Sequence, residues 1–211
     1  MTGTPDESAL ILAGGPIERC EAWTRVLRYC GVQFDGNPPE TWAFRYFDLI
    51  ETDPAVVTPQ DVLCAGALHH GLTRDDLTWF WDHRCDLENW LCRIPIDQAL
   101  RTADEATIDA LAEIPSRFAG PALSLVTKVL HRKRPWLIPI LDRELIDRYR
   151  PVTGQRRPGE AWAPLLHHLA HDLRENEEML AEFRLTLRIL HGFTVTDLRT
   201  VDIVVWMEGR R

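Results

Sequence analysis

The sequence predicts an all-α protein, a single compact helical domain of about eight to ten helices that spans residues 1–211. Apolar residues recur at intervals of three and four along almost every segment, helix-capping residues precede several segments, and there is no convincing set of alternating strands. The chain is long enough to bury a core without metals or disulfides, and its 45% hydrophobic and 27% charged residues are ordinary for a globular protein. We expect residues 1–15 to form a flexible N-terminal segment.

The predicted helices follow one another along the whole chain. The first has a proline in its first turn and Gly31 just past its end, which are usual start and stop signals. The second is aromatic on all sides, so a short strand is the alternative. The expected helices cover residues 16–30, 41–51, 59–72, 74–94, 104–114, 121–134, 142–150, 161–192 and 195–209.

The third and fourth helices have recognisable N-caps, Thr58 and Thr73. An apolar stripe along residues 74–94 is expected to face the core; it consists of Leu77, Trp81, Leu87 and Leu91, beside Trp79 and Trp90. Aromatic side chains could also form a platform for stacking bases, but a stripe at helical spacing is more often part of a core.

Breaker residues define the helices of the second half. Pro115 closes the helix over residues 104–114, and Pro135 must end the helix over residues 121–134. A loop rich in glycine and proline precedes the long region 161–192, which is expected to divide near Asn176. The last region is rich in β-branched residues, so a strand is again the alternative to a terminal helix.

Several classes of protein are excluded by composition. No run of about 18 apolar residues could cross a membrane, and no basic residues precede the short apolar patch near the N-terminus, so we expect a cytoplasmic protein. The cysteines are odd in number and none lies in a Cys-x-x-Cys pair, which predicts free, mostly buried thiols. We expect no metal and no cofactor: His167, His168 and His171 have partial metal-ligand spacing, but a solvated helix face explains them as well.

The net charge of −8 conceals a basic segment. Residues 128–157 contain nine Lys or Arg and three acids, a balance of +6, which leaves −14 on the rest of the chain. Such a segment in an acidic protein suggests that an anion binds this face. The expected anion-binding residues are Arg132, Lys133, Arg134 and Arg143. The alternative is that these side chains pair with acidic residues of the same chain.

The only two lysines of the chain, Lys128 and Lys133, lie in this segment. Lys128 is at the edge of the apolar stripe of its helix, and His131 and Arg132 follow on the same face. Partial burial and a neighbouring arginine would lower the pKa of the Lys128 amine toward that of a usable nucleophile or base. His131 could transfer protons or position a ligand.

An apolar connector then leads to Asp142 at the start of the next helix. An aspartate at this position usually caps free backbone N–H groups. The positive end of the helix would also keep it ionised, so that it could stabilise a developing cation or hold a water. Lys128, His131 and Asp142 are therefore the candidate catalytic residues.

The pattern Thr127-Lys128 followed by Pro139-Ile140-Leu141-Asp142 resembles the catalytic segment of helix-hairpin-helix DNA glycosylases, especially the 8-oxoguanine type. In that superfamily a lysine attacks the sugar carbon after the base is flipped out, and an aspartate supports the oxocarbenium-like centre. The resemblance would assign these roles to Lys128 and Asp142. It also implies a glycosylase-like helical fold and a nucleic acid or nucleotide as partner.

A second resemblance spans most of the chain. The sequence is similar to a domain-of-unknown-function family from high-GC bacteria, which supports one self-contained helical domain and implies no activity. The similar stretches are residues 128–130, 132–135, 137–139, 142–143 and 201–207.

Three functional hypotheses follow from the sequence. The first is an enzyme that uses Lys128 and Asp142 for C–N bond chemistry on a substrate containing a nucleobase. The second is a helical module that binds an anion or nucleic acid without chemistry, and the third is a structural or partner-binding helical protein. The sequence does not determine the substrate or the oligomeric state.

Overall fold

The structure, a computed structural model, describes residues 9–32, 43–68, 71–120, 123–155 and 157–208. These residues form a mostly helical protein with eleven α-helices and one small two-stranded sheet. The prediction of a helical protein is confirmed. The sheet corrects the prediction of a strictly all-α class. The elements are β1 (Ala9–Leu12), β2 (Gly15–Glu18), α1 (Arg19–Tyr29), the π-helical turn η1 (Phe44–Asp48), α3 (Pro59–Gly66), α4 (Arg74–Asp82), α5 (Arg84–Leu91), the 3₁₀ turn η2 (Leu100–Thr102), α6 (Glu105–Ala112), α7 (Ile114–Arg117), α8 (Leu123–Lys133), α9 (Arg143–Thr153), α10 (Pro158–Glu175), α11 (Glu177–His191) and α12 (Asp197–Glu208).

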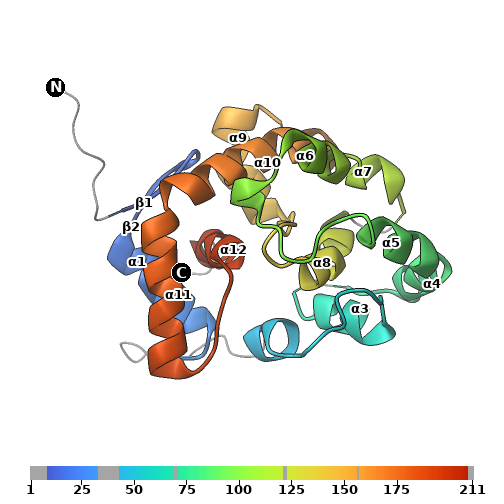
Figure 1. The fold of residues 1–211 in the computed structure, drawn as a ribbon, viewed down its shortest axis with the longest axis horizontal. Helices are drawn as coiled ribbons and strands as arrows, with labels where there is room; N and C mark the ends of the chain where they lie inside the picture. The colour runs from blue at the N-terminus through green and yellow to red at the C-terminus, as the bar shows by residue number, and fades with distance from the viewer. Residues whose placement is uncertain (1–8, 33–42, 69–70, 121–122, 156, 209–211) are drawn as a thin grey trace.

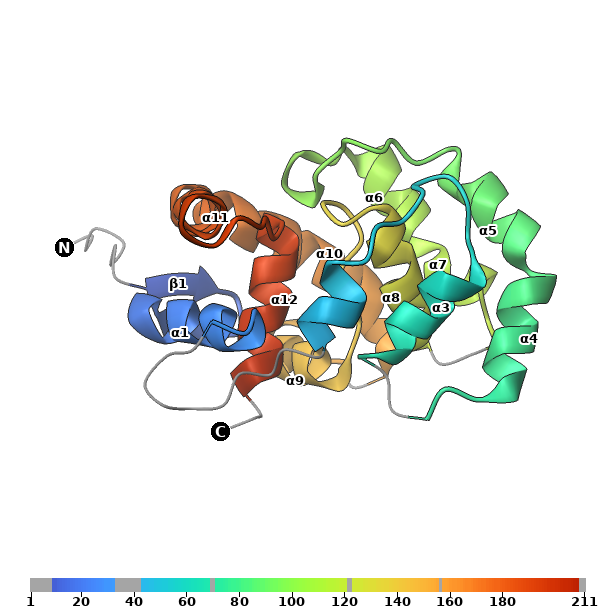
Figure 2. The ribbon, with the colours of Figure 1, turned by 90° about the horizontal axis from the view of Figure 1, so that it is seen from below.

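The helices form two groups that α9 and α10 join. Figures 1 and 2 show the hairpin, α1, α11 and α12 at one end of the molecule and the helices from α3 to α8 at the other. Helix α12 packs against α1, α9 and α11, while α3 packs against α8. Both α8 and α12 are buried along nearly their whole length, so each is the central helix of its group.

The antiparallel hairpin of β1 and β2 replaces two predicted features. Residues 9–15 were expected in a flexible segment and residues 16–18 in a helix. Both stretches instead contribute to the hairpin. The rest of the expected flexible segment, residues 1–8, lies outside the described part. Leu12 pairs with Gly15, so Ala13 and Gly14 form the turn. A Cβ on Gly14 would lie 2.2 Å from the Arg148 carbonyl oxygen, so the turn can pack on α9 only without a side chain there.

Capping explains why several helices start where the sequence predicts. The Thr58 and Thr73 hydroxyls accept hydrogen bonds from the amides three residues ahead, and each forms a capping box with the aspartate at that position. Asp142 caps α9 in the same way, at 2.9 Å from the Leu145 nitrogen. The long region 161–192 divides at Asn176, and the last region is helical. These predictions are confirmed.

The region 74–94 differs from its prediction. It bends at His83 into two helices, α4 and α5, and its apolar stripe does not all face the core. Leu87 and Leu91 are buried, but the Trp81 side chain is 61% exposed and Leu77 is also exposed. The bend at His83 changes the direction of the helix, so α4 and α5 cannot present one continuous face.

Candidate functional site

Lys128 lies inside the fold. Helix α8 is buried from Leu125 to Lys133, and Lys128 is only 3% exposed. Its amine donates a hydrogen bond of 2.5 Å to the Ser124 hydroxyl, one turn earlier. Burial lowers the pKa of Lys128, although the charges of Asp142 and Asp202 act in the opposite sense. The Lys128 amine therefore lies in a buried environment that differs from that of a surface lysine.

Asp142 caps a helix and also has a raised pKa. Its side chain is half-buried and accepts the Leu145 amide. Burial raises its pKa to about 6, against the effects of that hydrogen bond and of the Lys128 charge, which lower it. A carboxyl group with a pKa near neutrality can exchange a proton under physiological conditions.

A buried hydrogen bond fixes the two segments that contain Lys128 and Asp142. The Leu141 amide donates to the Thr127 hydroxyl at 3.0 Å, and these residues directly precede Asp142 and Lys128. The charges of Lys128 and Asp142 affect each other's pKa, so the two side chains are electrostatic neighbours. No ion pair within 4.0 Å joins them among the described residues.

His131 is also buried, and it is held neutral. Its Nδ1 lies 2.6 Å from the Ile138 carbonyl oxygen, to which it donates if the proton is on that nitrogen, and its ring stacks on Phe47. Burial and the Arg199 charge lower its pKa to about 4. Because Ile138 belongs to the connector after α8, this hydrogen bond holds the path of the chain toward Asp142.

Arg132, Lys133 and Arg134 do not form a basic surface. All three are buried, and their donors reach oxygens of distant segments of the same chain. Lys133 donates to Asp61 at 2.6 Å and to Thr52 at 2.5 Å. A role in binding an external anion would require these donors to leave their present partners.

The two arginines on either side of Lys133 bind mainly backbone carbonyls. Arg132 donates to Phe47 and Ile50 and pairs with Asp61 at 3.3 Å, while the carbonyls bound by Arg134 belong to Pro54, Leu91 and Ile94. The segments bound in this way lie on the α3 and α5 side of α8. The basic run is therefore a set of internal crosslinks, made mainly to backbone carbonyls and to one acid, Asp61.

Arg143 differs from its neighbours in the basic segment. Its side chain is 89% exposed, and it forms an ion pair with Asp147, at 3.5 Å on the same helix. An exposed pair of this kind contributes little to stability, so Arg143 is available to a ligand.

Four further residues belong to the same buried group and were missed in the sequence: Tyr29, Asp48, Arg199 and Asp202. The Arg199 guanidinium donates to Asp48 at 2.8 Å and also to Asp202 and the Tyr29 hydroxyl. Burial raises the pKa of Asp202 to about 7, and its Oδ1 is buried without a hydrogen-bond partner in the described part of the chain. The signal available in the sequence was the spacing of Arg199 and Asp202, three residues apart on one helix face.

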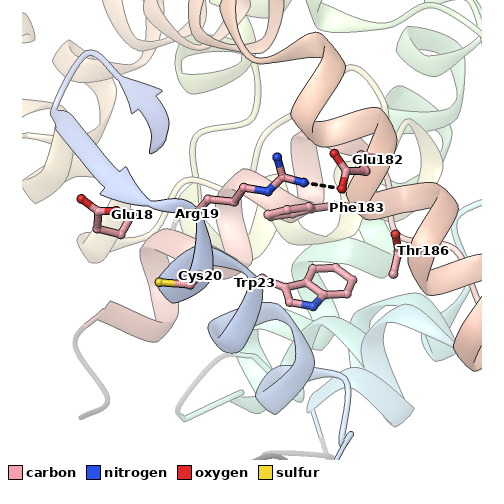
Figure 3. A pocket seen from close by; sticks show the side chains of 7 residues that line it. All are labelled: Glu18, Arg19, Cys20, Trp23, Glu182, Phe183 and Thr186. Atoms are coloured by element: carbon pink, nitrogen blue, oxygen red, sulfur yellow. Dashed lines mark hydrogen bonds and ion pairs between the residues drawn. The ribbon is translucent and has the colours of Figure 1, made fainter. Parts of the chain in front are cut away.

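Two cavities lie apart from this group. The first, of about 360 Å³, lies between α1 and α11, where Trp23 and Phe183 are 4.8 Å apart between ring centroids and an Arg19–Glu182 ion pair crosses its edge (Figure 3). The second, of about 380 Å³, is an apolar groove between α3 and α4 beside Trp81. Neither contains a residue of the buried group.

The third cavity reaches one edge of the group. It measures about 250 Å³ and is lined by residues that include Asp48, His131, Arg132 and Arg199. Lys128 and Asp142 do not line any of these three cavities. The residues that affect the Lys128 amine by hydrogen bonding or by charge include Ser124, Asp142 and Glu144, each of which is half-buried.

The histidines and cysteines outside this group show no comparable arrangement. His167 and His171 are exposed, and the described residues contain no cluster of three metal ligands. All five cysteines are free; Cys30 and Cys64 are buried, but the other three are exposed, so the prediction of mostly buried thiols is wrong.

In the part of the chain that the structure describes, every helix is too short or too polar to cross a membrane.

Comparisons with known proteins place the chain in a family without assigning an activity. Neither the curated proteins nor the solved structures provided a match. The model of a family of unknown function, DUF6308, matches residues 22–209, which include every residue of the buried group. The matched region covers most of the sequence, and the chain therefore belongs to the DUF6308 family.

Proposed function

We propose that this protein is an enzyme in which the Lys128 amine acts as nucleophile on a substrate containing a nucleobase, with Asp142 as the assisting carboxyl group. One observation supports the proposal most: within the described part of the chain, the hydrogen-bond partner of the buried Lys128 amine is a neutral hydroxyl, and the pKa values of neighbouring carboxyl groups are raised to about 6 and 7. Such groups cost folding free energy, and they are concentrated at functional sites.

The chemistry follows from these two groups. The neutral Lys128 amine attacks the sugar carbon that bears the base, a C–N bond to the amine forms, and the bond from that carbon to the base breaks. The electron pair of the broken bond leaves with the base, which takes a proton from water. The amine loses a proton to the ionised Asp142, which passes it to the ring oxygen as the bond from the sugar carbon to that oxygen breaks, and an iminium linkage to Lys128 remains.

The substrate class comes from the resemblance of residues 127–142 to the catalytic segment of the glycosylases. A small substrate is favoured over a long polynucleotide, because the net charge is −8 and three of the basic residues are used inside the fold. The exposed Arg143, one residue after Asp142, is suitably charged to contact a phosphate of the substrate.

Access to the amine requires a small rearrangement. Lys128 is buried, and Ser124, Asp142 and Glu144, which affect it by hydrogen bonding or by charge, are half-buried. We expect binding of the substrate to displace the Ser124 hydroxyl from the amine.

Reductive trapping tests this proposal directly. The protein is incubated with nucleoside 5′-monophosphates, or with an oligonucleotide containing an abasic deoxyribose, in the presence of cyanoborohydride, and modified peptides are identified by mass spectrometry. We expect a reduced adduct on Lys128. Lys133, the only other lysine, is an internal control because its amine is held by Asp61. An adduct only on Lys133 or on the terminal amine, or unchanged turnover in Lys128→Met, would contradict the proposal.

A structural, partner-binding role is the second candidate, and the internal crosslinks from Arg132, Lys133 and Arg134 favour it. Trapping and turnover in Lys128→Met separate the two roles. If Lys128 serves only the fold, a Lys128→Met variant that still folds gives the same binding of partners as the wild type, and no substrate is trapped on the wild type. If Lys128 serves catalysis, a folded Lys128→Met variant loses both trapping and turnover.

A further inference from the structure

The apolar groove between α3 and α4 leaves large apolar side chains in contact with solvent. The two helices pack against each other at one end of the molecule (Figure 2). The groove measures about 380 Å³, within the range of about 300–1,000 Å³ that is usual for small-ligand sites. Its buried lining includes Val57, Val62 and Phe80, whereas Leu63 and Leu77 line it and are exposed. Apolar side chains that are exposed together often mark a binding surface.

A tryptophan and an arginine complete the lining of this groove. The Trp81 side chain is exposed, and the central carbon of the Arg84 guanidinium lies 4.7 Å from the centroid of the Trp81 ring. This cation–π contact holds the guanidinium over one face of the indole. Arg84 is the first residue of α5, and it provides the only charged side chain among the described residues that line the groove. A positive charge is therefore held beside an apolar surface.

The Arg84 guanidinium has few partners within the fold. Its Nε lies 4.0 Å from Oε1 of Glu88, and that oxygen already accepts a hydrogen bond of 3.0 Å from the Val57 amide. In the part of the chain that the structure describes, neither terminal nitrogen of Arg84 donates a hydrogen bond. The side chain is 38% exposed, so these two nitrogens can meet a ligand. Two parallel N–H groups match the two oxygens of a carboxylate.

We propose that the groove between α3 and α4 binds a small amphipathic carboxylate of the fatty-acid class. Its apolar chain lies on Leu63, Leu77 and Trp81, and its carboxylate accepts hydrogen bonds from Arg84. A single negative charge is favoured over the two charges of a phosphate monoester, because Glu88 lies close to the same guanidinium. The groove contains no residue of the buried group, so this ligand site is independent of the proposed function.

The size of the groove favours a small ligand over a protein partner. Helix α3 has eight residues and α4 has nine, so each extends for about 12–14 Å at about 1.5 Å per residue. Ten described residues line the groove, whereas a standard protein interface uses about 20–30 residues from each partner. A groove of this length can enclose one short chain and its head group.

Isothermal titration calorimetry with octanoate tests this site, and octanol and octyltrimethylammonium are probes with the same chain but no charge or the opposite charge. We expect octanoate to bind more tightly than either. Arg84→Gln should weaken octanoate binding about tenfold and leave octanol binding unchanged, because only the carboxylate uses the guanidinium. Arg84→Lys keeps the charge but not the paired donors, so it should lose less. Arg74→Gln removes an exposed arginine of α4 that does not line the groove and is the matched control.

The position of the ligand is measured by ¹H–¹⁵N NMR. Octanoate should shift the indole N–H signal of Trp81, assigned with Trp81→Phe, and leave the signal of Trp23 unchanged in the cavity between α1 and α11. No octanoate binding at millimolar concentration, equal binding of octanoate and octanol, or a shift at Trp23 instead of Trp81 would overturn the proposal. Self-association in sedimentation velocity that Leu77→Glu abolishes would also overturn it, because a second copy of the chain would then occupy the groove.

Discussion

The Thr127 hydroxyl accepts a buried hydrogen bond of 3.0 Å from the Leu141 amide, across fourteen positions of sequence. Each of these residues directly precedes one of the two proposed catalytic residues. The bond closes the connector between α8 and α9 and determines where Asp142 lies relative to Lys128. Its loss should therefore disturb both stability and the site.

We expect Thr127→Val to lower the free energy of unfolding by about 1–3 kcal/mol, because it leaves the buried Leu141 amide without an acceptor while keeping the shape of the side chain. Thr127→Ser keeps the hydroxyl and should lose less. Denaturant unfolding monitored by circular dichroism gives both values. If valine and serine had equal effects, the hydrogen bond would have no particular importance.

Removal of one partner from the buried pair of Lys133 and Asp61 should destabilise the protein strongly. Burial raises the pKa of Asp61, but hydrogen bonds from Lys133, Thr52 and Thr58 outweigh it, and the pKa lies below its ordinary value. Asp61→Asn should cost about 3–5 kcal/mol, since it leaves the Lys133 ammonium buried without a counterion. The same burial lowers the pKa of Lys133, and this desolvation is the cost of the pair.

The pH dependence of this pair follows from the lowered pKa of Asp61. Its stabilisation is complete above the pKa of the unfolded aspartate, about 4, and is lost as the pH falls through the lower value of the folded state. Equilibrium unfolding as a function of pH should show this loss in the wild type and not in Asp61→Asn. Glu160→Gln, which breaks the exposed pair with Arg157, should change stability by less than about 1 kcal/mol at any pH.

His131 should make the protein less stable in weak acid. An unfolded histidine takes up a proton below about pH 6.5, whereas the pKa of the folded His131 is about 4. Its contribution is therefore present above pH 6.5 and decreases by up to about 3 kcal/mol as the pH falls to 4. Asp142 and Asp202 have raised pKa values, so their contributions to stability increase as the pH falls. The effect of His131 is therefore measured by comparing the wild type with His131→Gln. The difference in unfolding free energy between these two proteins should narrow toward pH 4. A constant difference would show that the pKa of His131 is the same in the folded and unfolded states, and would contradict the prediction.

Arg199 and Arg143 should respond very differently to the same substitution. Arg199 is buried and joins α12 to Asp48 and to the Tyr29 hydroxyl of α1, so Arg199→Met should cost about 3–5 kcal/mol by leaving Asp48 and Asp202 uncompensated. Arg143→Met changes an exposed side chain and should alter stability by about 0.5 kcal/mol or less. Thermal unfolding of the two variants, measured side by side, checks this contrast.

Local signals in the sequence were sufficient for most helix boundaries. Thr58, Thr73 and Asp142 cap helices with their own side chains three residues ahead, so the information lies within one turn of chain. The capping role of Asp142 and the burial of Lys128 could be inferred for the same reason: both depend on position along one helix.

Features that depend on distant partners could not be predicted. Arg134 looks like a surface residue in the sequence because the carbonyls that it binds are 40 to 80 positions away. The hairpin was missed for a similar reason, since the Ile11 amide and carbonyl both bond to Asn176. Asp202 belongs to the candidate site only because α12 packs against α9, a contact between distant parts of the sequence.

The Asp172 carboxylate accepts hydrogen bonds from both the Ala13 amide, at 2.8 Å, and the Tyr149 hydroxyl, at 2.6 Å. A hairpin of two four-residue strands is not stable by itself, so this docking ties its persistence to the helices beneath it. Deuterium uptake at Ala13, near the beginning of the sequence, should consequently follow opening of the α9 and α10 region more than 130 positions later. Deuterium uptake at this one backbone amide thus reports whether the two helix groups remain joined.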